Sequence, residues 1–92
     1  MNAPLVLQQR LDLPAAAPLA SALRAQAGSD LIIDAGEVSH LGGLCLQVLA
    51  AAAISWRQAG NDLRLTPRSQ SFDDALDLFG VTLADLETEG SA

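Results

Sequence analysis

The sequence predicts an α/β protein in which a small, open, mixed β-sheet is flanked by three to four helices. The sheet is expected to have about four strands and a mainly parallel core. Half of the 92 residues are apolar, which is enough for one domain to bury a core. Short apolar runs alternate along the chain with longer segments of helical periodicity. This alternation of strand and helix is typical of parallel pairing with right-handed crossovers.

The first strand and the first helix are predicted from a short apolar run and a proline. Residues 4–9 suit a strand, and the alternation over residues 10–13 allows its pairing to extend. Pro14 fits the first turn of a helix, where its missing N–H costs no hydrogen bond. The helix is expected over about residues 15–26, and Gly28 supplies the left-handed residue that ends it.

A central strand and the longest helix follow. Leu31-Ile32-Ile33-Asp34 is apolar at successive positions, which predicts a strand covered on both faces. The Gly42-Gly43 pair opens a helix over about residues 44–58 whose circumference is mostly apolar. Such a helix is buried widely or uses its second face for a partner. Trp56 and Arg57 fit either core and rim, or the aromatic anchor and charge of an interface.

A third strand and a third helix complete the fold. Residues 63–66 alternate as a strand that Pro67 closes, and Ser69 or Ser71 can cap the next helix. The residues expected on the core side of that helix are Phe72, Ala75, Leu76 and Phe79.

The chain ends in an acidic segment. Residues 1–71 are neutral overall, so the whole net charge of −6 comes from Phe72 onward. A last helical turn is expected over about residues 81–86, followed by a frayed acidic terminus at about 87–92. A neutral body with an acidic end, and only 3% aromatic residues, argues against nucleic acid and anionic lipid as ligands. Solvated helix faces explain these acids more simply than a basic partner does.

The residue inventory predicts a cytoplasmic protein that is not an enzyme. Cys45 is the only cysteine, so no internal disulfide forms, and the first residues lack the basic start of a signal peptide. The uncharged stretch 38–56 contains glycines and polar residues, which favours a buried helix over a membrane insertion. His40 is the only histidine, and its spacing from Cys45 supports no catalytic dyad. The sequence contains no metal-ligand cluster and no cofactor motif. The pattern most similar to a metal-ligand cluster is the acidic group Asp73, Asp74 and Asp77, which a solvated helix face explains better.

The stretch from Leu31 to Val81 resembles a STAS domain, the fold of bacterial anti-sigma-factor antagonists and of sulfate-transporter tails. The segments that carry the resemblance are Leu31-Ile32-Ile33-Asp34, Val38-Ser39-His40-Leu41-Gly42-Gly43-Leu44, Gly60-Asn61-Asp62-Leu63-Arg64-Leu65 and Ser71-Phe72-Asp73-Asp74-Ala75-Leu76-Asp77-Leu78-Phe79-Gly80-Val81. The long-helix segment is similar to that of small stand-alone STAS proteins found with alphaproteobacterial chemotaxis genes.

The sequence departs from the family at the phosphorylation site. Where phosphorylatable members carry Asp-Ser-Ser-Gly, this chain has Gly42, Gly43, Leu44 and Cys45. These four residues offer no hydroxyl, and Ser39 upstream is a poor substitute. The resemblance therefore implies a member that is not phosphorylated at the usual position.

The resemblance implies a non-catalytic interaction module in bacterial signal transduction, with chemotaxis and a histidine kinase partner as the leading expectation. The partner-binding residues are expected to be Ser39, His40, Gly42, Gly43 and Gln47. The physical motivation is that two residues without side chains allow a close approach, while polar side chains interrupt an apolar segment. The alternatives are a regulatory STAS subunit of an ABC-type lipid transporter and a binder of small anions at the Gly42-Gly43 helix start. A monomer or a weak homodimer is expected.

Overall fold

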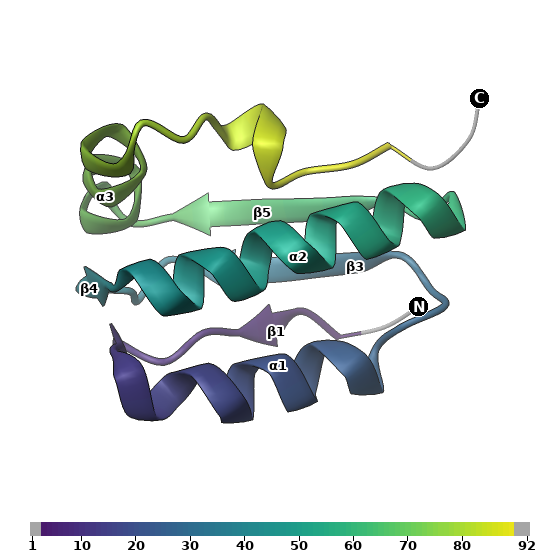
Figure 1. Cartoon of the computed structure of the whole chain (residues 1–92), viewed down its shortest axis with the longest axis horizontal. Helices are drawn as coiled ribbons and strands as arrows, with labels where there is room; N and C mark the ends of the chain where they lie inside the picture. Colours follow the sequence, from purple (N-terminus) through teal and green to yellow (C-terminus); the bar gives the residue numbers. More distant parts are fainter. Residues whose placement is uncertain (1–2, 90–92) are drawn as a thin grey trace.

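The computed structural model describes residues 3–89 and has the predicted succession of strands and helices, so the α/β class is confirmed. The elements in chain order are β1 (Leu5–Val6), β2 (Arg10–Leu11), the 3₁₀ turn η1 (Leu13–Ala15), α1 (Ala16–Ala25), β3 (Leu31–Ala35), β4 (His40–Leu41), α2 (Gly43–Ala59), β5 (Leu63–Arg68), α3 (Gln70–Phe79) and the 3₁₀ turn η2 (Leu83–Asp85). Figure 1 shows this arrangement with both long helices lying along the sheet.

The strands form two small parallel sheets instead of one mixed sheet of about four strands. The larger sheet has the order β1-β3-β5, and in its register Leu5 lies opposite Ile33 and Leu31 opposite Leu63. The smaller sheet pairs β2 with β4. The parallel core is therefore as predicted. The difference arises because the chain leaves the larger sheet after Leu7, whose N–H donates to the Asp34 carbonyl at 2.9 Å, and pairs again only at β2.

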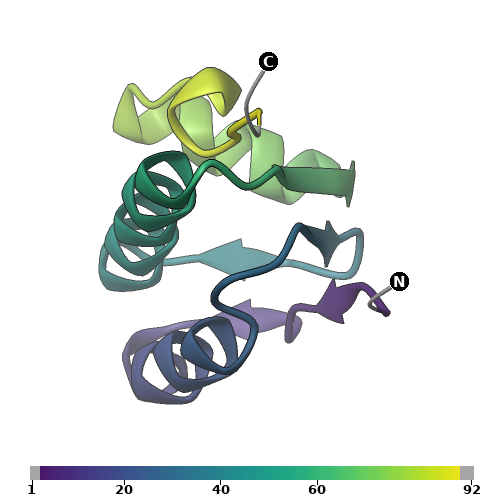
Figure 2. The same ribbon diagram turned by 90° about the vertical axis from the view of Figure 1, so that its right-hand side faces the viewer.

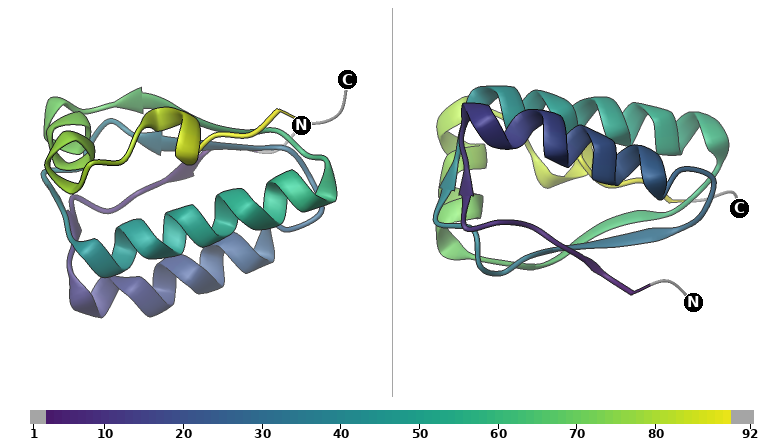
Figure 3. Two further views of the ribbon diagram at one scale, coloured as in Figure 1. Left: turned by 45° about the horizontal axis from the view of Figure 1, so that its top comes forward. Right: turned by 90° about the horizontal axis from the view of Figure 1, so that it is seen from below.

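Helices cover one face of the larger sheet, and the prediction of a strand covered on both faces is wrong. Helices α1 and α2 lie side by side on the same face, while α3 lies across one end of the sheet (Figures 2 and 3). On the open face Val6 is 53% exposed and Ile32 is 44% exposed, whereas Ile33 on the covered face is fully buried. The sheet order explains this: right-handed crossovers that advance in one direction place both connecting helices on the same side.

The core lies between this covered face and the three helices. Trp56 of α2 belongs to it, with 4% exposure, and its indole N–H donates to the Ser29 carbonyl at 2.9 Å. Of the two interpretations of this residue, the core position is the one observed. Arg57 is exposed, and Gly60 ends α2 in the left-handed conformation at φ +74°.

Two details of β5 and α3 differ from the sequence prediction. Strand β5 continues through Pro67 to Arg68, which is possible because β5 is the last strand of its sheet and Pro67 stands near its end. The N-cap of α3 is Ser69, one of the two predicted caps, and its hydroxyl accepts from the Phe72 N–H at 3.0 Å. Phe79 is 45% exposed and does not lie in the core, because the helix ends at this residue and α3 crosses the end of the sheet.

The segment that follows η2 is ordered as far as the structure describes it. Leu63 and Thr88 exchange two backbone hydrogen bonds of 2.9 and 3.0 Å, and Thr88 is 4% exposed. The Glu87 carboxylate accepts from the Leu65 N–H at 2.9 Å. Residues 87 and 88 thus bond to β5, where the sequence predicted the start of a frayed terminus. Residues 90–92 lie outside the described part.

Candidate functional site

The five residues predicted to bind a partner lie around β4 and the first turns of α2. Ser39 and His40 are both exposed at the start of β4, and both of their backbone N–H groups donate to the Gln9 carbonyl. Gly42 is the N-cap of α2, Gly43 is its first residue, and Gln47 is exposed one turn later. In Figure 1 this region forms the end of the molecule where β4 and α3 also lie.

Gly42 is held against the backbone of β2. Its N–H donates to the Leu11 carbonyl at 2.8 Å. A Cβ atom at this position would stand 3.2 Å from the same carbonyl oxygen and 3.9 Å from the Asp12 Cα. Gly42 therefore joins the start of α2 closely to the smaller sheet. The absence of a side chain at this position allows close packing within the chain, and a close approach by a partner is not needed to explain it.

Gly43 faces the aromatic ring of Phe79. A Cβ atom at Gly43 would lie 3.7 Å from Phe79 Cε1 and 3.8 Å from Phe79 Cζ, which is ordinary van der Waals contact. Phe79 reaches this place because α3 packs against β4. Leu44 beside Gly43 is 45% exposed, as Phe79 is. We call Gly43, Leu44 and Phe79 the helix-start patch.

The sequence did not reveal this patch. Phe79 stands far along the chain from Gly43 and shares the spacing of the buried residues Phe72 and Leu76. Leu44 is the first residue of the helix predicted over about residues 44–58, and no local pattern marks it as exposed. The available signal was the glycine after Phe79, because a helix that ends at Gly80 leaves its last turn near solvent.

The environment of the helix start does not favour anions. Gly42 has no side chain to cap the first turn, so backbone N–H groups of that turn have no side-chain acceptor. Directly behind this turn lies Asp12, whose carbonyl accepts a hydrogen bond from Cys45 Sγ at 3.4 Å. Burial raises the pKa of the Cys45 thiol, and the negative charge of Asp12 raises it further. The nearby Arg10 forms an ion pair with Asp12 at 3.6 Å.

The cysteine, the histidine and the serine of this region have different environments. Cys45 is fully buried, whereas His40 is exposed. The Ser39 hydroxyl donates to the Gln9 carbonyl at 3.0 Å. Within residues 3–89, no group of three or more His, Cys, Asp or Glu side chains could hold a metal ion. In the same part of the chain, no helix combines the length and apolarity that crossing a membrane needs.

Comparison with known proteins gives no match: no protein-family model, no curated protein and no solved structure is detectably similar to this chain.

Proposed function

We propose that this chain is a non-catalytic, STAS-like interaction module of bacterial signal transduction that binds its partner at the start of α2. The observation that carries the proposal is the helix-start patch. Two large apolar side chains, Leu44 and Phe79, are each 45% exposed, and both adjoin Gly43: Leu44 follows it in the chain, and the Phe79 ring faces it. Exposed apolar groups that gather at one place mark surfaces that bind other molecules.

The surroundings of the patch have the composition of a protein interface. Ser39, His40 and Gln47 are exposed polar residues of the same region, and none of them is a Lys, Arg, Asp or Glu. Protein interfaces combine an apolar core poor in charged residues with a polar rim. Gly43 gives a partner backbone room to approach the Phe79 ring.

The resemblance to small STAS proteins of chemotaxis clusters supports a histidine kinase as the partner. An ABC-type lipid transporter ATPase is the alternative binding partner for the same surface. A small anion is the weaker alternative, because Asp12 lies directly behind the helix start and the exposed groups there are apolar. Since Gly42, Gly43, Leu44 and Cys45 carry no hydroxyl, we expect this binding not to be switched by serine phosphorylation at the helix start.

The test is a Gly43→Arg substitution. Arginine at the first position of α2 fits the helix but places a long charged side chain over the Phe79 ring, so we expect affinity for the partner to fall at least about tenfold. Gln58→Arg is the matched control, because it adds the same side chain at an exposed position near the other end of α2.

Binding is measured by biolayer interferometry with two baits from the source organism, the chemotaxis histidine kinase and the lipid-transporter ATPase. Thermal melting of both variants shows whether the fold is retained. If Gly43→Arg melts like the wild type and binds with wild-type affinity, the partner does not use the start of α2. Binding to the ATPase alone would keep the surface and replace the kinase by the transporter.

A further inference from the structure

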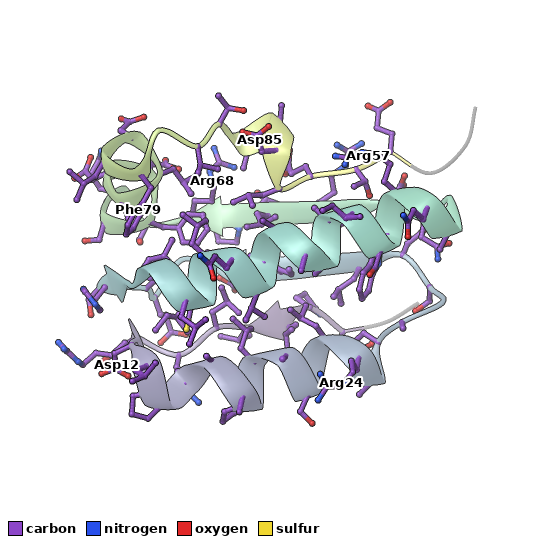
Figure 4. The ribbon with its side chains drawn as sticks, viewed as in Figure 1. Asp12, Arg24, Arg57, Arg68, Phe79 and Asp85 are labelled. Atoms are coloured by element: carbon purple, nitrogen blue, oxygen red, sulfur yellow. The ribbon has the colours of Figure 1, made fainter. Side chains whose placement is uncertain are left out.

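A second surface lies away from the helix-start patch, between α1 and α2. A groove of about 250 Å³ runs between the two helices, and its lining is mainly apolar and built from small side chains. Leu23 and Ala52 contribute to it together with the core residue Trp56. We call this the α1/α2 groove. Arg24 lines its edge, near the end of α1 that lies farthest from α3 (Figure 4).

The two helices that form the groove, α1 and α2, contain no acidic residues. Residues 13–29 and 38–61, which contain both long helices, include no Asp or Glu although the chain has a net charge of −6. Among residues 3–89, the arginines that form ion pairs are Arg10, Arg64 and Arg68, so neither Arg24 nor Arg57 has an acidic partner there. The groove is thus apolar with an unpaired positive charge at its edge.

Helix α3 has the complementary character. Leu78 is 84% exposed, the highest value among the large apolar side chains of residues 3–89. Asp74 lies one helical turn before Leu78 and therefore on the same side of α3. Asp77 is also exposed beside it. This helix end thus presents an apolar side chain flanked by carboxylates.

We propose that Leu78 of one copy inserts into the α1/α2 groove of a second copy, with Asp74 placed against Arg24. Two surfaces of the same chain then complement each other in shape and in charge. Helix α3 lies at the opposite end of the molecule from Arg24, so the contact cannot form within one chain (Figures 1 and 4). We take the contact to be head-to-tail, so that each copy can bind one copy at its groove and another at its Leu78.

The association is expected to be weak. One side chain in a groove of about 250 Å³ makes a small interface, so we expect a dissociation constant on the order of 0.1 to 1 mM. The net charge of each copy opposes the approach, but at physiological salt the Debye length is about 8 Å, so charges outside the contact are screened. The pair of Arg24 with Asp74 acts within that distance and should fix the orientation.

The experiment is sedimentation velocity of the full chain between about 10 μM and about 1 mM, a range that brackets the expected dissociation constant. The wild type should pass from monomer to larger species as concentration rises. Ala51→Glu fills the groove from an exposed helix position, and Leu78→Asp removes the inserted side chain. Each variant alone should remain monomeric. Thr66→Glu on the exposed face of β5 adds the same charge elsewhere and should associate like the wild type.

Mixing the two monomeric variants distinguishes a head-to-tail contact from a symmetric one. Leu78→Asp keeps its groove and Ala51→Glu keeps its Leu78, so an equimolar mixture should form a 1:1 dimer and nothing larger. A wild type that stays monomeric at about 1 mM overturns the proposal. A mixture that stays monomeric overturns it too, as does either variant associating like the wild type.

Charge reversal provides a second readout that misfolding cannot imitate. Arg24→Asp should abolish association, and Arg24→Asp combined with Asp74→Arg should restore it, because the ion pair is rebuilt with opposite polarity. Failure of the double variant to recover association, with both proteins melting normally, would remove Asp74 from the contact. Gly43→Arg changes neither a groove-lining residue nor Leu78 or Asp74 and should associate like the wild type, so this result is independent of the proposed partner site.

Discussion

The two faces of the β1-β3-β5 sheet differ sharply although the same strands supply both. Toward the helices, Ile33 and Leu65 are fully buried, while their neighbours Ile32 and Arg64 lie on the face that no helix covers. Ile32 and Ile33 are identical side chains one residue apart, and the strand pleat alone sends them to opposite sides. The comparison teaches that residue type sets what a position can tolerate, while topology decides which positions are buried.

The largest expected effect comes from charge on the covered side. Leu46 of α2 is 5% exposed, and Leu46→Asp would bury a carboxylate without a partner, at a cost of several kcal/mol that a domain of this size cannot absorb. Leu76→Asp in α3, where Leu76 is 4% exposed, should unfold the chain for the same reason. Ile32→Asp on the open face should lose only about 1 kcal/mol. Circular dichroism melting separates them; a Leu46→Asp protein with the wild-type melting temperature would place Leu46 in solvent.

A smaller effect distinguishes the two neighbouring isoleucines. Ile33→Ala removes fully buried methyl groups and leaves a cavity, so we expect a loss of about 2 to 5 kcal/mol in the free energy of unfolding. Ile32→Ala, at a position 44% exposed, should lose less than about 1 kcal/mol. Urea denaturation gives both values. Equal losses would mean that Ile32 is covered in solution, which this structure does not show.

Deprotonation of the buried Cys45 thiol should also destabilise the covered side of the sheet. Burial and the neighbouring Asp12 raise the pKa of Cys45 above its usual value of 9.0, so the folded state binds the thiol proton more tightly than the unfolded chain does. Stability from this group is complete below that usual value and falls as pH rises from there through the higher folded pKa. Unfolding measured from pH 7 to pH 10 should show this decline, and Cys45→Ala should lack it. An identical pH profile for both proteins would contradict the buried environment of the thiol.

The smallest effect concerns two adjacent glycines where the helix layer meets the smaller sheet. Gly42→Ala places a Cβ 3.2 Å from the Leu11 carbonyl, so the closely held helix start must shift and stability should fall by about 1 kcal/mol. Gly43→Ala makes only ordinary contact with Phe79 and improves helix propensity, so stability should rise by up to about 1 kcal/mol. Opposite signs in chemical denaturation are the expected result. A stabilising Gly42→Ala would show that β2 can move away freely.

The sequence predicted the elements of this fold because their signals are local. The run Leu31-Ile32-Ile33-Asp34 marks a strand by its composition, and Gly60 marks the end of α2 by its conformational freedom. The sequence could not predict which face of the sheet stays open, since a β-branched run has the same composition whether helices cover one side of it or both. That property depends on the direction in which successive strands are added, which is a relation between distant segments.

The candidate site divides in the same way. Ser39 to Gln47 lie together because they are consecutive, so their grouping needed no structure. Phe79 joins them only through the packing of α3 against β4, and helical periodicity alone assigned it to the core. Similarly, Ser69 and Ser71 are both acceptable caps by sequence. The observed cap is Ser69, whose hydroxyl also donates to the Val38 carbonyl from the turn before β4, a contact that no local pattern contains.

The pairing of residues 87–88 with β5 limits how the sheet can grow. Backbone groups of Leu63 are bonded to Thr88, and the Leu65 N–H is bonded to the Glu87 carboxylate, so that edge offers fewer free partners to a strand from another molecule. The opposite edge is β1, which is only two residues long. Indefinite stacking of strands requires two receptive edges on every unit. In the described part of the chain one edge is occupied and the other is short. At most one edge of this sheet can therefore accept a strand from another molecule, which makes the sheet a poor repeating unit for a fibril.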